Sequence, residues 1–319
     1  MNQVNKGSTG GLRNTFGTMI PDRKTIMENP RWVEYIQLTF ADFLAALGCR
    51  PEIRPRLINR LMEAARADGD ETWYEENAHA MLRDATSDQE WKRALGDRVG
   101  RIFNQVKAHL KPGATLDYGC GSGGVGRLIQ EYQGSVTLAD TYRHPDIGRI
   151  GLPFVLLEQR APAPLPSEAY DNVFLCTVLH HCDLPLDTLS EAIRVTRRGG
   201  SLLIIESVYG VESEVISKAP PNHIVKAFAA LEEEGQLAVN VFFDHIHNRC
   251  LYYSADPATK VNVPYNYQRS ANWEETFARH GLKTGTVVSL GIDQPLAPLF
   301  HTLHVAVRPE DDASARHTS

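Results

Sequence analysis

A glycine-rich turn at residues 115–124 is the part of the sequence with the clearest chemical meaning. Its first residues, TLDY, are typical of a short buried strand, and Gly119, Gly121 and Gly123 then let the backbone bend tightly and approach a ligand. A helix after such a turn points its free backbone N–H groups at the bound molecule. Gly119, Gly121 and Gly124 also satisfy the GxGxxG pattern of dinucleotide-binding proteins. The glycines alone therefore predict a nucleotide cofactor without identifying it.

Two carboxylates near the turn narrow the choice of cofactor. Asp117 precedes the first glycine by two residues, where its charge faces a pyrophosphate poorly but suits the ammonium and sulfonium groups of S-adenosylmethionine. Asp140 closes the next predicted strand, about 20 residues after the glycines, where a carboxylate accepts hydrogen bonds from ribose hydroxyls. NAD-dependent enzymes bind ribose in the same way, so a nicotinamide-dependent oxidoreductase is a minor alternative.

A third segment favours S-adenosylmethionine. The residues LPxxxYDxV at 165–173, which run into CTVLHH at 176–181, resemble the fourth-strand segment of class I methyltransferases, and the order of the segments over residues 95–206 is similar to that family. The resemblance implies that S-adenosylmethionine is the cofactor. It also implies that the cofactor is bound by residues of the glycine turn, the end of the second strand, the adenine loop and the end of the fourth strand, namely Asp117, Tyr118, Gly119, Cys120, Gly121, Ser122, Gly123, Asp140, Thr141, Gln159, Arg160 and Cys176.

Two adjacent histidines follow the fourth predicted strand, beside the position expected for the cofactor sulfur. Methyl transfer is an in-line displacement on a carbon that the sulfonium already activates, so the protein mainly aligns the acceptor and excludes water. A general base helps when the acceptor is a hydroxyl, an amine or a carbon acid, and histidine suits that role near neutral pH. His180 and His181 are therefore the predicted catalytic residues, with His181 preferred, and a packing role for the pair is the alternative.

A second group of histidines lies in the segment DHIH at 244–247. If this segment is a strand, alternate residues share a face, so His245 and His247 point together and the aspartate before them points away. Some keto-acid C-methyltransferases similar to this chain use a two-histidine metal site. We nevertheless expect these histidines to line a substrate pocket or to be buried with hydrogen-bond partners, and we expect no metal. Together with Arg13 and Tyr253, they are the predicted substrate-binding residues.

The elements that must position these residues form an α/β pattern. Short apolar strands alternate with helices, which is typical of a Rossmann-like, doubly wound sheet with mostly parallel strands and helices on both faces. The final apolar pair, 282–292 and 301–309, completes this sheet, and its last strand is expected to be antiparallel. The earlier predicted strands are 114–118, 135–140, 153–158, 171–176 and 201–207, and the predicted helices are 122–132, 144–150 and 184–197.

Two further regions flank or interrupt this pattern. Residues 31–110 show helical periodicity, strongest over 31–48, and residues 1–110 are predicted to form a helical lid whose apolar face serves as a domain core or as a homodimer interface. The stretch between the fifth strand and the last two is far longer than a crossover needs, so residues 208–269 are predicted to be a substrate-shaping insertion. The cofactor domain is expected to span 111–309, with a flexible tail over 310–319.

Composition bounds the location and the partners of the protein. The 319 residues include 33 basic and 39 acidic side chains, mixed along the chain, with a formal net charge of −6, so no nucleic-acid partner is expected. The sequence shows neither the apolar core of a signal peptide nor a membrane-spanning run, and its five cysteines form no CxxC pair. We therefore expect a cytoplasmic protein with no membrane partner.

These features together predict a transferase that uses S-adenosylmethionine to methylate a small molecule of amino-acid, keto-acid or secondary-metabolite type. Two alternatives keep the same cofactor. One is attack on another sulfonium carbon, such as intramolecular cyclisation of S-adenosylmethionine to azetidine-2-carboxylate with release of methylthioadenosine. The other is a non-catalytic protein that binds S-adenosylmethionine.

Overall fold

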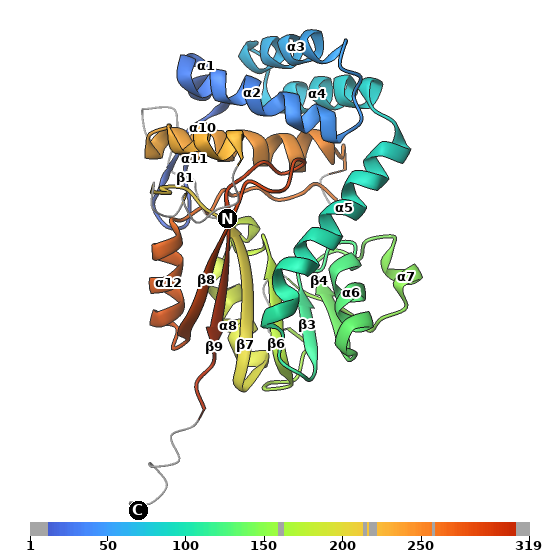
Figure 1. Cartoon of the computed structure of the whole chain (residues 1–319), viewed down its shortest axis with the longest axis vertical. Helices are drawn as coiled ribbons and strands as arrows, with labels where there is room; N and C mark the ends of the chain where they lie inside the picture. The colour runs from blue at the N-terminus through green and yellow to red at the C-terminus, as the bar shows by residue number, and fades with distance from the viewer. Residues whose placement is uncertain (1–11, 159–162, 213–215, 217–221, 257–258, 311–319) are drawn as a thin grey trace, which may run out of the picture.

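A seven-stranded sheet forms the lower half of the molecule (Figure 1). The computed structural model describes residues 12–158, 163–212, 216, 222–256 and 259–310. The strands of this sheet are β3 (Thr115–Tyr118), β4 (Val136–Asp140), β5 (Phe154–Leu156), β6 (Tyr170–Cys176), β7 (Thr196–Ser207), β8 (Lys283–Gly291) and β9 (His301–Val307). Their order is β5-β4-β3-β6-β7-β9-β8. β9 pairs antiparallel with β7 and β8, and all the other pairs are parallel.

This strand order creates a switch point in the middle of the sheet. The chain enters at β3, runs to one edge through β4 and β5, and returns to β6 on the other side of β3. In doubly wound sheets, ligands bind at the carboxyl ends of the strands where the order reverses. The structure thus confirms the predicted Rossmann-like sheet with an antiparallel last strand, and it places the glycine turn and the paired histidines at the same switch point.

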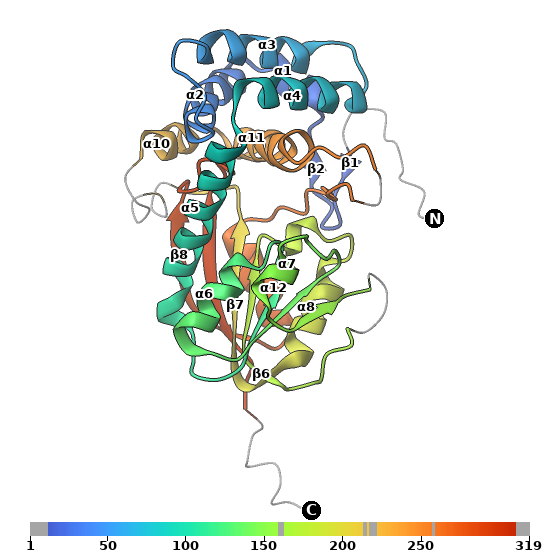
Figure 2. The ribbon, with the colours of Figure 1, turned by 90° about the vertical axis from the view of Figure 1, so that its right-hand side faces the viewer.

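Helices cover both faces of the sheet (Figure 2). One face is covered by α5 (Asp88–Val106), α6 (Gly124–Gln133) and α7 (Ile147–Ile150), and the other by α8 (Pro185–Val195) and α12 (Ser270–Arg279); the short 3-10 turns are η1 (Lys107–His109) and η2 (Leu179–His181). Ile102 of α5 and Ile129 of α6 share one core with Leu138 and Phe174 of the sheet. None of the helices in the described part of the chain is long and apolar enough to span a membrane.

A helical cap lies over the ends of β6 and β7 (Figure 1). It is built from α1 (Arg23–Glu28), α2 (Pro30–Ala46), α3 (Arg54–Arg66), α4 (Glu71–Ala85), α10 (His223–Ala229), α11 (Glu233–His245) and the π-helix η3 (Ile246–Leu251). The predicted apolar helix at 31–48 is α2. Its Phe40 packs edge-on against Phe242 and Phe243 of α11, with ring centroids 5.7 and 5.4 Å apart. Because the insertion covers this face of α2 within one chain, the face serves as a core, and a homodimer stays a prediction.

The segment around residues 244–247 is helical, so the strand geometry expected for it is wrong. α11 ends at His245 and continues directly into the π-helical turn η3. Its valines and phenylalanines suit a strand locally, but the cap surrounds them, and every residue from 235 to 244 is buried. Residues two apart in a helix point roughly 200° apart. His245 and His247 therefore face different surroundings and are not a pair.

An N-terminal hairpin closes the side of the molecule below the cap. It consists of β1 (Leu12–Arg13) and β2 (Met19–Ile20), which pair antiparallel. The side-chain amide of Asn14 donates a hydrogen bond of 3.0 Å to the carbonyl of Tyr265, and the backbone N–H of Thr15 donates one of 2.8 Å to Oδ1 of Asn266. The hairpin is thus attached to a segment that lies about 250 residues later in the chain.

Candidate functional site

The glycine-rich turn follows β3 at the switch point of the sheet. Gly119, Gly121 and Gly123 have φ angles of +77°, +53° and +74°, in the left-handed region that favours glycine. A Cβ atom on Gly119 would lie 2.5 Å from the side chain of Val178, so this turn touches the turn after β6. A Cβ atom on Gly121 would meet no described atom within 4 Å. The middle of the turn therefore faces open space, where its backbone can approach a ligand.

Asp117 is buried beneath the turn, with 3% of its surface exposed. Its Oδ2 accepts a hydrogen bond of 3.0 Å from the backbone N–H of Gly126 in α6. Burial raises the pKa of the Asp117 carboxyl to about 7; the hydrogen bond from Gly126 opposes this rise, and the charge of Asp140 adds to it. Near neutral pH the site thus holds a half-ionised carboxyl group, and a bound cation would complete its ionisation.

Asp140, at the end of β4, connects this strand to the glycine turn. Its Oδ2 accepts a hydrogen bond of 2.8 Å from the backbone N–H of Gly121, and its Oδ1 accepts one of 3.2 Å from the loop that follows. Each carboxylate oxygen can accept a second hydrogen bond, so the predicted contact with ribose hydroxyls is compatible with these bonds. Thr141 is exposed beside it. The residues predicted near adenine, Gln159 and Arg160, lie outside the described residues.

The remaining predicted cofactor residues belong to the same two turns. Tyr118 is buried in β3, Cys120 and Ser122 are half-buried in the glycine turn, and Cys176 ends β6. Burial raises the pKa of the Cys120 thiol well above its ordinary value and that of Cys176 to about 12. Both thiols are therefore protonated at neutral pH, and they supply surface to the site without acting as nucleophiles.

His180 is buried between a carboxylate and an aromatic ring. Its Nδ1 lies 2.5 Å from Oε2 of Glu206, near the end of β7, and its ring stacks on Tyr267 with centroids 4.9 Å apart. Oε1 of Glu206 accepts hydrogen bonds from the backbone N–H groups of Val178 and Leu179. Burial alone would lower the pKa of His180, but the Glu206 carboxylate raises it above the ordinary value. Nδ1 is thus occupied, and Nε2 is the nitrogen left for a ligand.

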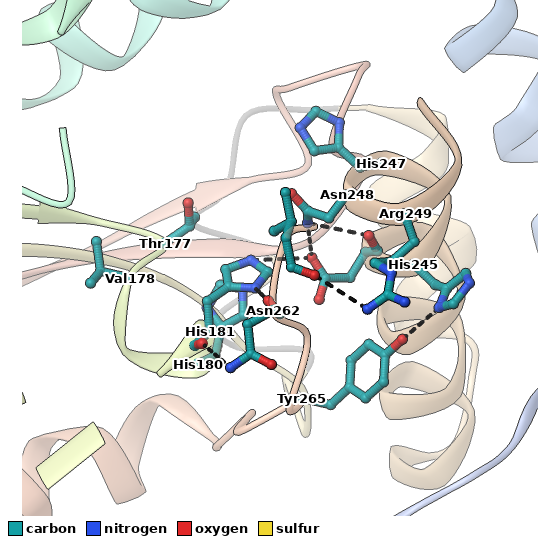
Figure 3. A network of polar contacts seen from close by, with 12 residues as sticks. Thr177, Val178, His180, His181, His245, His247, Asn248, Arg249, Asn262 and Tyr265 are labelled. Carbon is teal, nitrogen blue, oxygen red and sulfur yellow. Dashed lines mark hydrogen bonds and ion pairs between the residues drawn. The ribbon is translucent and has the colours of Figure 1, made fainter. Parts of the chain in front are cut away.

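His181 lies in a different electrostatic environment. Its Nδ1 is 2.9 Å from the carbonyl oxygen of Asn262, which can only accept, so Nδ1 carries the proton. Its Nε2 faces the end of α11 (Figure 3) and lies 3.4 Å from Oδ1 of Asp244. Burial lowers the pKa of His181; Asp244 opposes this shift, and His180 adds to it. The ring is therefore neutral near pH 7, with its lone pair on Nε2.

Asp244 is the polar residue of this group that sequence reasoning missed. The strand hypothesis pointed it away from the histidines of its own segment, whereas α11 directs it at His181. Asn248 of η3 donates a hydrogen bond of 2.7 Å to Oδ1 of Asp244. One possible metal-binding atom each from His180, His181 and Asp244 lies within 4.8 Å of the other two. The orientation of α11 depends on contacts with the distant cap helices, and no local sequence signal reports them.

A cavity of about 900 Å³ lies next to this group, lined by residues of the hairpin, α1, α4 and α11. Two predicted substrate residues, Arg13 and His245, line it. Nδ1 of His245 lies 2.7 Å from the hydroxyl of Tyr265. Burial, together with the charge of nearby Arg249, lowers the pKa of His245 to about 3, so this ring is neutral at physiological pH.

The other two predicted substrate residues are not part of the cavity wall. Nδ1 of His247 lies 2.5 Å from the carbonyl oxygen of Leu296, and burial lowers the pKa of this histidine to about 4. The hydroxyl of Tyr253 donates a hydrogen bond of 2.7 Å to Glu76 of α4. Both side chains thus have partners within the protein.

A buried ion-pair cluster forms one wall of the cavity. Glu75 of α4 is fully buried, and its two oxygens lie 2.9 Å from Arg249 and 2.6 Å from Lys260. Both cations come from the insertion, on either side of Tyr253 in the sequence. The cluster therefore joins the N-terminal cap to the insertion at the place where the cavity forms.

Three features define the class I methyltransferase fold. They are the strand order, the glycine turn at the switch point, and a carboxylate near the end of each of β3 and β4. Residues 116–204, which contain the glycine turn and the histidine pair, match the family model of the methyltransferase domain. The chain therefore contains a methyltransferase domain, as the resemblance implied, and S-adenosylmethionine is the cofactor of such a domain.

Solved structures show remote similarity to the chain. Geranyl diphosphate C-methyltransferase from Streptomyces coelicolor A3(2) is 17% identical, with 77% of this chain and 86% of that chain covered and a TM-score of 0.44. The 1,6-didemethyltoxoflavin-N1-methyltransferase from Burkholderia thailandensis is 16% identical, with 70% and 92% covered and a TM-score of 0.44. A search of curated proteins found no match. At these identities, the acceptors of those enzymes are not transferred to this chain.

The residues at the switch point fit S-adenosylmethionine. The open space over Gly121 admits a ligand against the backbone, and the buried carboxyl of Asp117 offers a counter-charge for a cationic group. Asp140 stands at the rim, with oxygens that can accept further hydrogen bonds. We expect Asp117 and the glycines to hold the methionine part and Asp140 to hold the ribose. When bound, the cofactor supplies an activated methyl carbon.

Proposed function

We propose that this enzyme methylates a small molecule of the amino-acid, keto-acid or secondary-metabolite type in the cytoplasm. The observation that carries the proposal is the position of His181, whose free Nε2 lone pair lies beside the cofactor turn and faces Asp244. Because the sulfonium already activates the methyl carbon, the protein has to hold the acceptor in line and keep water away. A neutral histidine suits this task, since its lone pair can bind or activate an acceptor.

The path from the cofactor turn to His181 is short, which supports this assignment. Val178, three residues before His181, packs against Gly119 of the turn. The turn η2 then carries both histidines towards the segment around Asn266, whose backbone N–H donates a hydrogen bond of 3.0 Å to the carbonyl of His180. An acceptor held by His181 would therefore lie close to the cofactor.

The neighbouring cavity supports a small acceptor. Asp183 and Asn266 line it, and Asn266 also donates a hydrogen bond of 2.7 Å to the carbonyl of Cys182, directly after the histidine pair. Its volume of about 900 Å³ falls in the range of ordinary small-molecule pockets. Aliphatic side chains such as Ile26 and Val241 share the wall with charged ones such as Arg13. This mixture favours a compact acceptor with both apolar and polar parts.

We also propose that residues 1–110 and the insertion 208–269 act together as the lid that excludes water. The hydrogen bonds from Asn14 and Thr15 to the 265–266 segment, and the ion pairs of Glu75, all join these two regions. Closing such a lid over the acceptor strengthens polar interactions inside the site and prevents hydrolysis.

Product analysis tests the proposed reaction. The purified full-length protein is incubated with S-adenosylmethionine alone and with panels of amino acids, 2-oxo acids and phenols, and the cofactor products are quantified by mass spectrometry. S-adenosylhomocysteine that forms only with an acceptor supports methyl transfer. Methylthioadenosine formed without an acceptor would overturn the proposal in favour of intramolecular cyclisation. Cofactor binding without either product would favour a non-catalytic protein.

A variant pair tests the role of His181. His181→Ala should lower turnover by about 100-fold or more, because it removes the lone pair that contacts the acceptor, while cofactor affinity changes little. The matched control is His144→Ala, since His144 also faces an aspartate, Asp146, at 3.6 Å but lies on the surface. Equal turnover of the two variants would contradict the assignment.

A further inference from the structure

We propose that His180, His181 and Asp244 form a binding site for a divalent transition-metal ion such as Fe²⁺, Co²⁺ or Zn²⁺. One possible ligand atom from each residue lies within 4.8 Å of the other two. Two imidazole nitrogens with one carboxylate oxygen are a donor set that these ions prefer, and it leaves coordination positions open. This site differs from the histidine pair at 245 and 247, which the helical geometry of α11 separates.

The distance between His181 and Asp244 fits a shared ion. A direct charge-assisted N–H···O bond between them would be about 2.7–2.9 Å long. The observed separation of Nε2 and Oδ1 is 3.4 Å. When two ligand atoms bind the same tetrahedral ion, each at about 2.1 Å from it, the two atoms lie about 3.4 Å from each other. The two side chains are thus placed as neighbouring ligands and not as a hydrogen-bonded pair.

Both histidines are oriented as metal ligands usually are. Metal-binding histidines donate one ring N–H to a carboxylate or a backbone carbonyl, which fixes the tautomer and directs the other nitrogen at the ion. Nδ1 of His180 is 2.5 Å from Oε2 of Glu206, and Nδ1 of His181 is 2.9 Å from the carbonyl oxygen of Asn262. In both rings Nε2 is therefore the nitrogen available for a ligand.

The carboxylate of Asp244 supplies an independent reason to expect a cation. Its side chain is 2% exposed, and its Oδ2 finds no hydrogen-bond donor within the described ranges. The Tyr267 hydroxyl lies within reach of a longer side-chain hydrogen bond to Asp244, but it is neutral and brings no counter-charge. A buried carboxylate without a counter-charge is strongly unfavourable.

The charges around the site also balance with one divalent ion. Arg249 of η3 is close to Asp244 in sequence, but its guanidinium group pairs with Glu75 instead. In the part of the chain that the structure describes, neither Asp244 nor Glu206 has an arginine or lysine within ion-pair distance, and their ionisable neighbours at that distance are His181 and His180. With both histidines neutral, as ligands must be, one divalent cation offsets these two buried carboxylates.

An ion at this position would lie beside the cofactor turn. Val178, which directly precedes the turn η2 that carries both histidines, packs on Gly119 of the cofactor turn. With the ion bound, His181 would hold the acceptor through the ion and not by direct contact: open coordination positions would accept oxygen or nitrogen atoms of the acceptor, and the ion would lower the pKa of a group bound there. This consequence rests on the proposed function. The metal site does not, since it is defined by protein ligands alone.

Metal titration of the full-length protein tests the site without cofactor or acceptor. Protein stripped with a chelator is titrated with ZnCl₂ by calorimetry and with CoCl₂ by visible absorption, which reports ligand geometry. We expect one ion per chain. Asp244→Asn, which keeps the size of the side chain, and His181→Ala should each weaken binding by about 100-fold, and Glu206→Gln by about 10-fold through loss of His180 orientation. His144→Ala, at the partly exposed His144–Asp146 pair, should bind as the wild type does.

Circular dichroism and melting curves establish that each variant is folded before its titration is interpreted. The proposal is overturned if the folded wild type binds neither ion at concentrations up to about 100 times the protein concentration. It is equally overturned if Asp244→Asn and His181→Ala both bind with wild-type affinity. In either case Asp244 would have another cation as its partner, such as an ammonium group of a ligand. Because no turnover is measured, failure of methyl transfer would leave this result unchanged.

Discussion

Replacing Asp117 by asparagine should stabilise the free protein and weaken its binding of S-adenosylmethionine. Asparagine resembles the protonated acid in shape, and its Oδ1 can still accept the hydrogen bond from Gly126. Unlike Asp117, it has no proton to release when the chain unfolds. The two effects have opposite signs because the buried carboxyl is unfavourable in the free protein and useful only when a cation is bound.

The sign and size of the stability effect follow from the raised pKa. Burial raises the pKa of Asp117 from 3.8 to about 7, so between these values the unfolded chain releases a proton that the folded chain keeps. The wild type therefore loses stability as the pH rises from 3.8 to about 7, and the loss then stays constant. At 1.36 kcal/mol per pKa unit, the full loss is about 4 kcal/mol, of which about 2–3 kcal/mol develops between pH 5 and 8.

Urea denaturation of both proteins at pH 5 and pH 8 measures this effect. The free energy of unfolding of Asp117→Asn minus that of the wild type should increase by about 2–3 kcal/mol between the two pH values. Asp187→Asn, at an exposed aspartate of α8, is the matched control and should show no such increase. A difference that stays constant with pH, or a variant less stable than the wild type at pH 8, would refute the assigned burial.

Calorimetry with S-adenosylmethionine measures the binding effect. Ionisation of Asp117 between pH 6 and 8 should make the wild type bind about ten-fold more tightly relative to the variant, because the ionised form is the one that attracts a cation. We compare the ratio of the dissociation constants of the two proteins, because any titration of the cofactor affects both constants equally and cancels. A ratio independent of pH would show that Asp117 does not contact a cationic part of the ligand.

Three further substitutions test the rest of the arrangement. Asp140→Ala should weaken cofactor binding by about 1–3 kcal/mol in calorimetry if this carboxylate accepts ribose hydrogen bonds, and an effect near zero would refute that role. Phe40→Ala should lower the free energy of unfolding by about 3–5 kcal/mol in urea, because the ring is fully buried between α2 and α11; a loss below about 1 kcal/mol would contradict that packing. Glu75→Gln should cost about 3 kcal/mol in the same assay, since Arg249 and Lys260 lose a buried partner, and unchanged stability would show the pairs to be dispensable.

The glycine turn and the two carboxylates beside it could be predicted from the sequence because their signals are local. A strand of four residues, three glycines that need positive φ angles, and a carboxylate at each of two strand ends all lie within residues 115–140. Parallel strands bring their carboxyl ends to one edge, so the neighbouring segments meet there whatever the rest of the chain does. For the same reason, the position of His180 and His181 next to the turn follows from their place at the end of a strand.

The acceptor side could not be predicted because it depends on contacts between distant segments. The strand geometry considered for residues 244–247 does not form, because this segment belongs to a helix packed in the cap, and the helix directs Asp244, His245 and His247 differently. A helix that is buried on all sides has no polar, solvent-exposed face. The pattern of polar and apolar residues therefore does not show in which direction each of its side chains points. Two of the four predicted substrate residues accordingly do not line the cavity.

The sequence by itself thus determined the sheet, the glycine turn and the cofactor, since these follow from short-range periodicity and from backbone conformations that only glycine adopts readily. The tertiary structure alone decided which groups surround His181. Asp244 reaches His181 from a helix more than 60 residues later in the chain, and the packing of α11 against α2 sets the rotation of that helix. Rotation of a buried helix is a property of its packed neighbours, so this part of the site exists only in the folded chain.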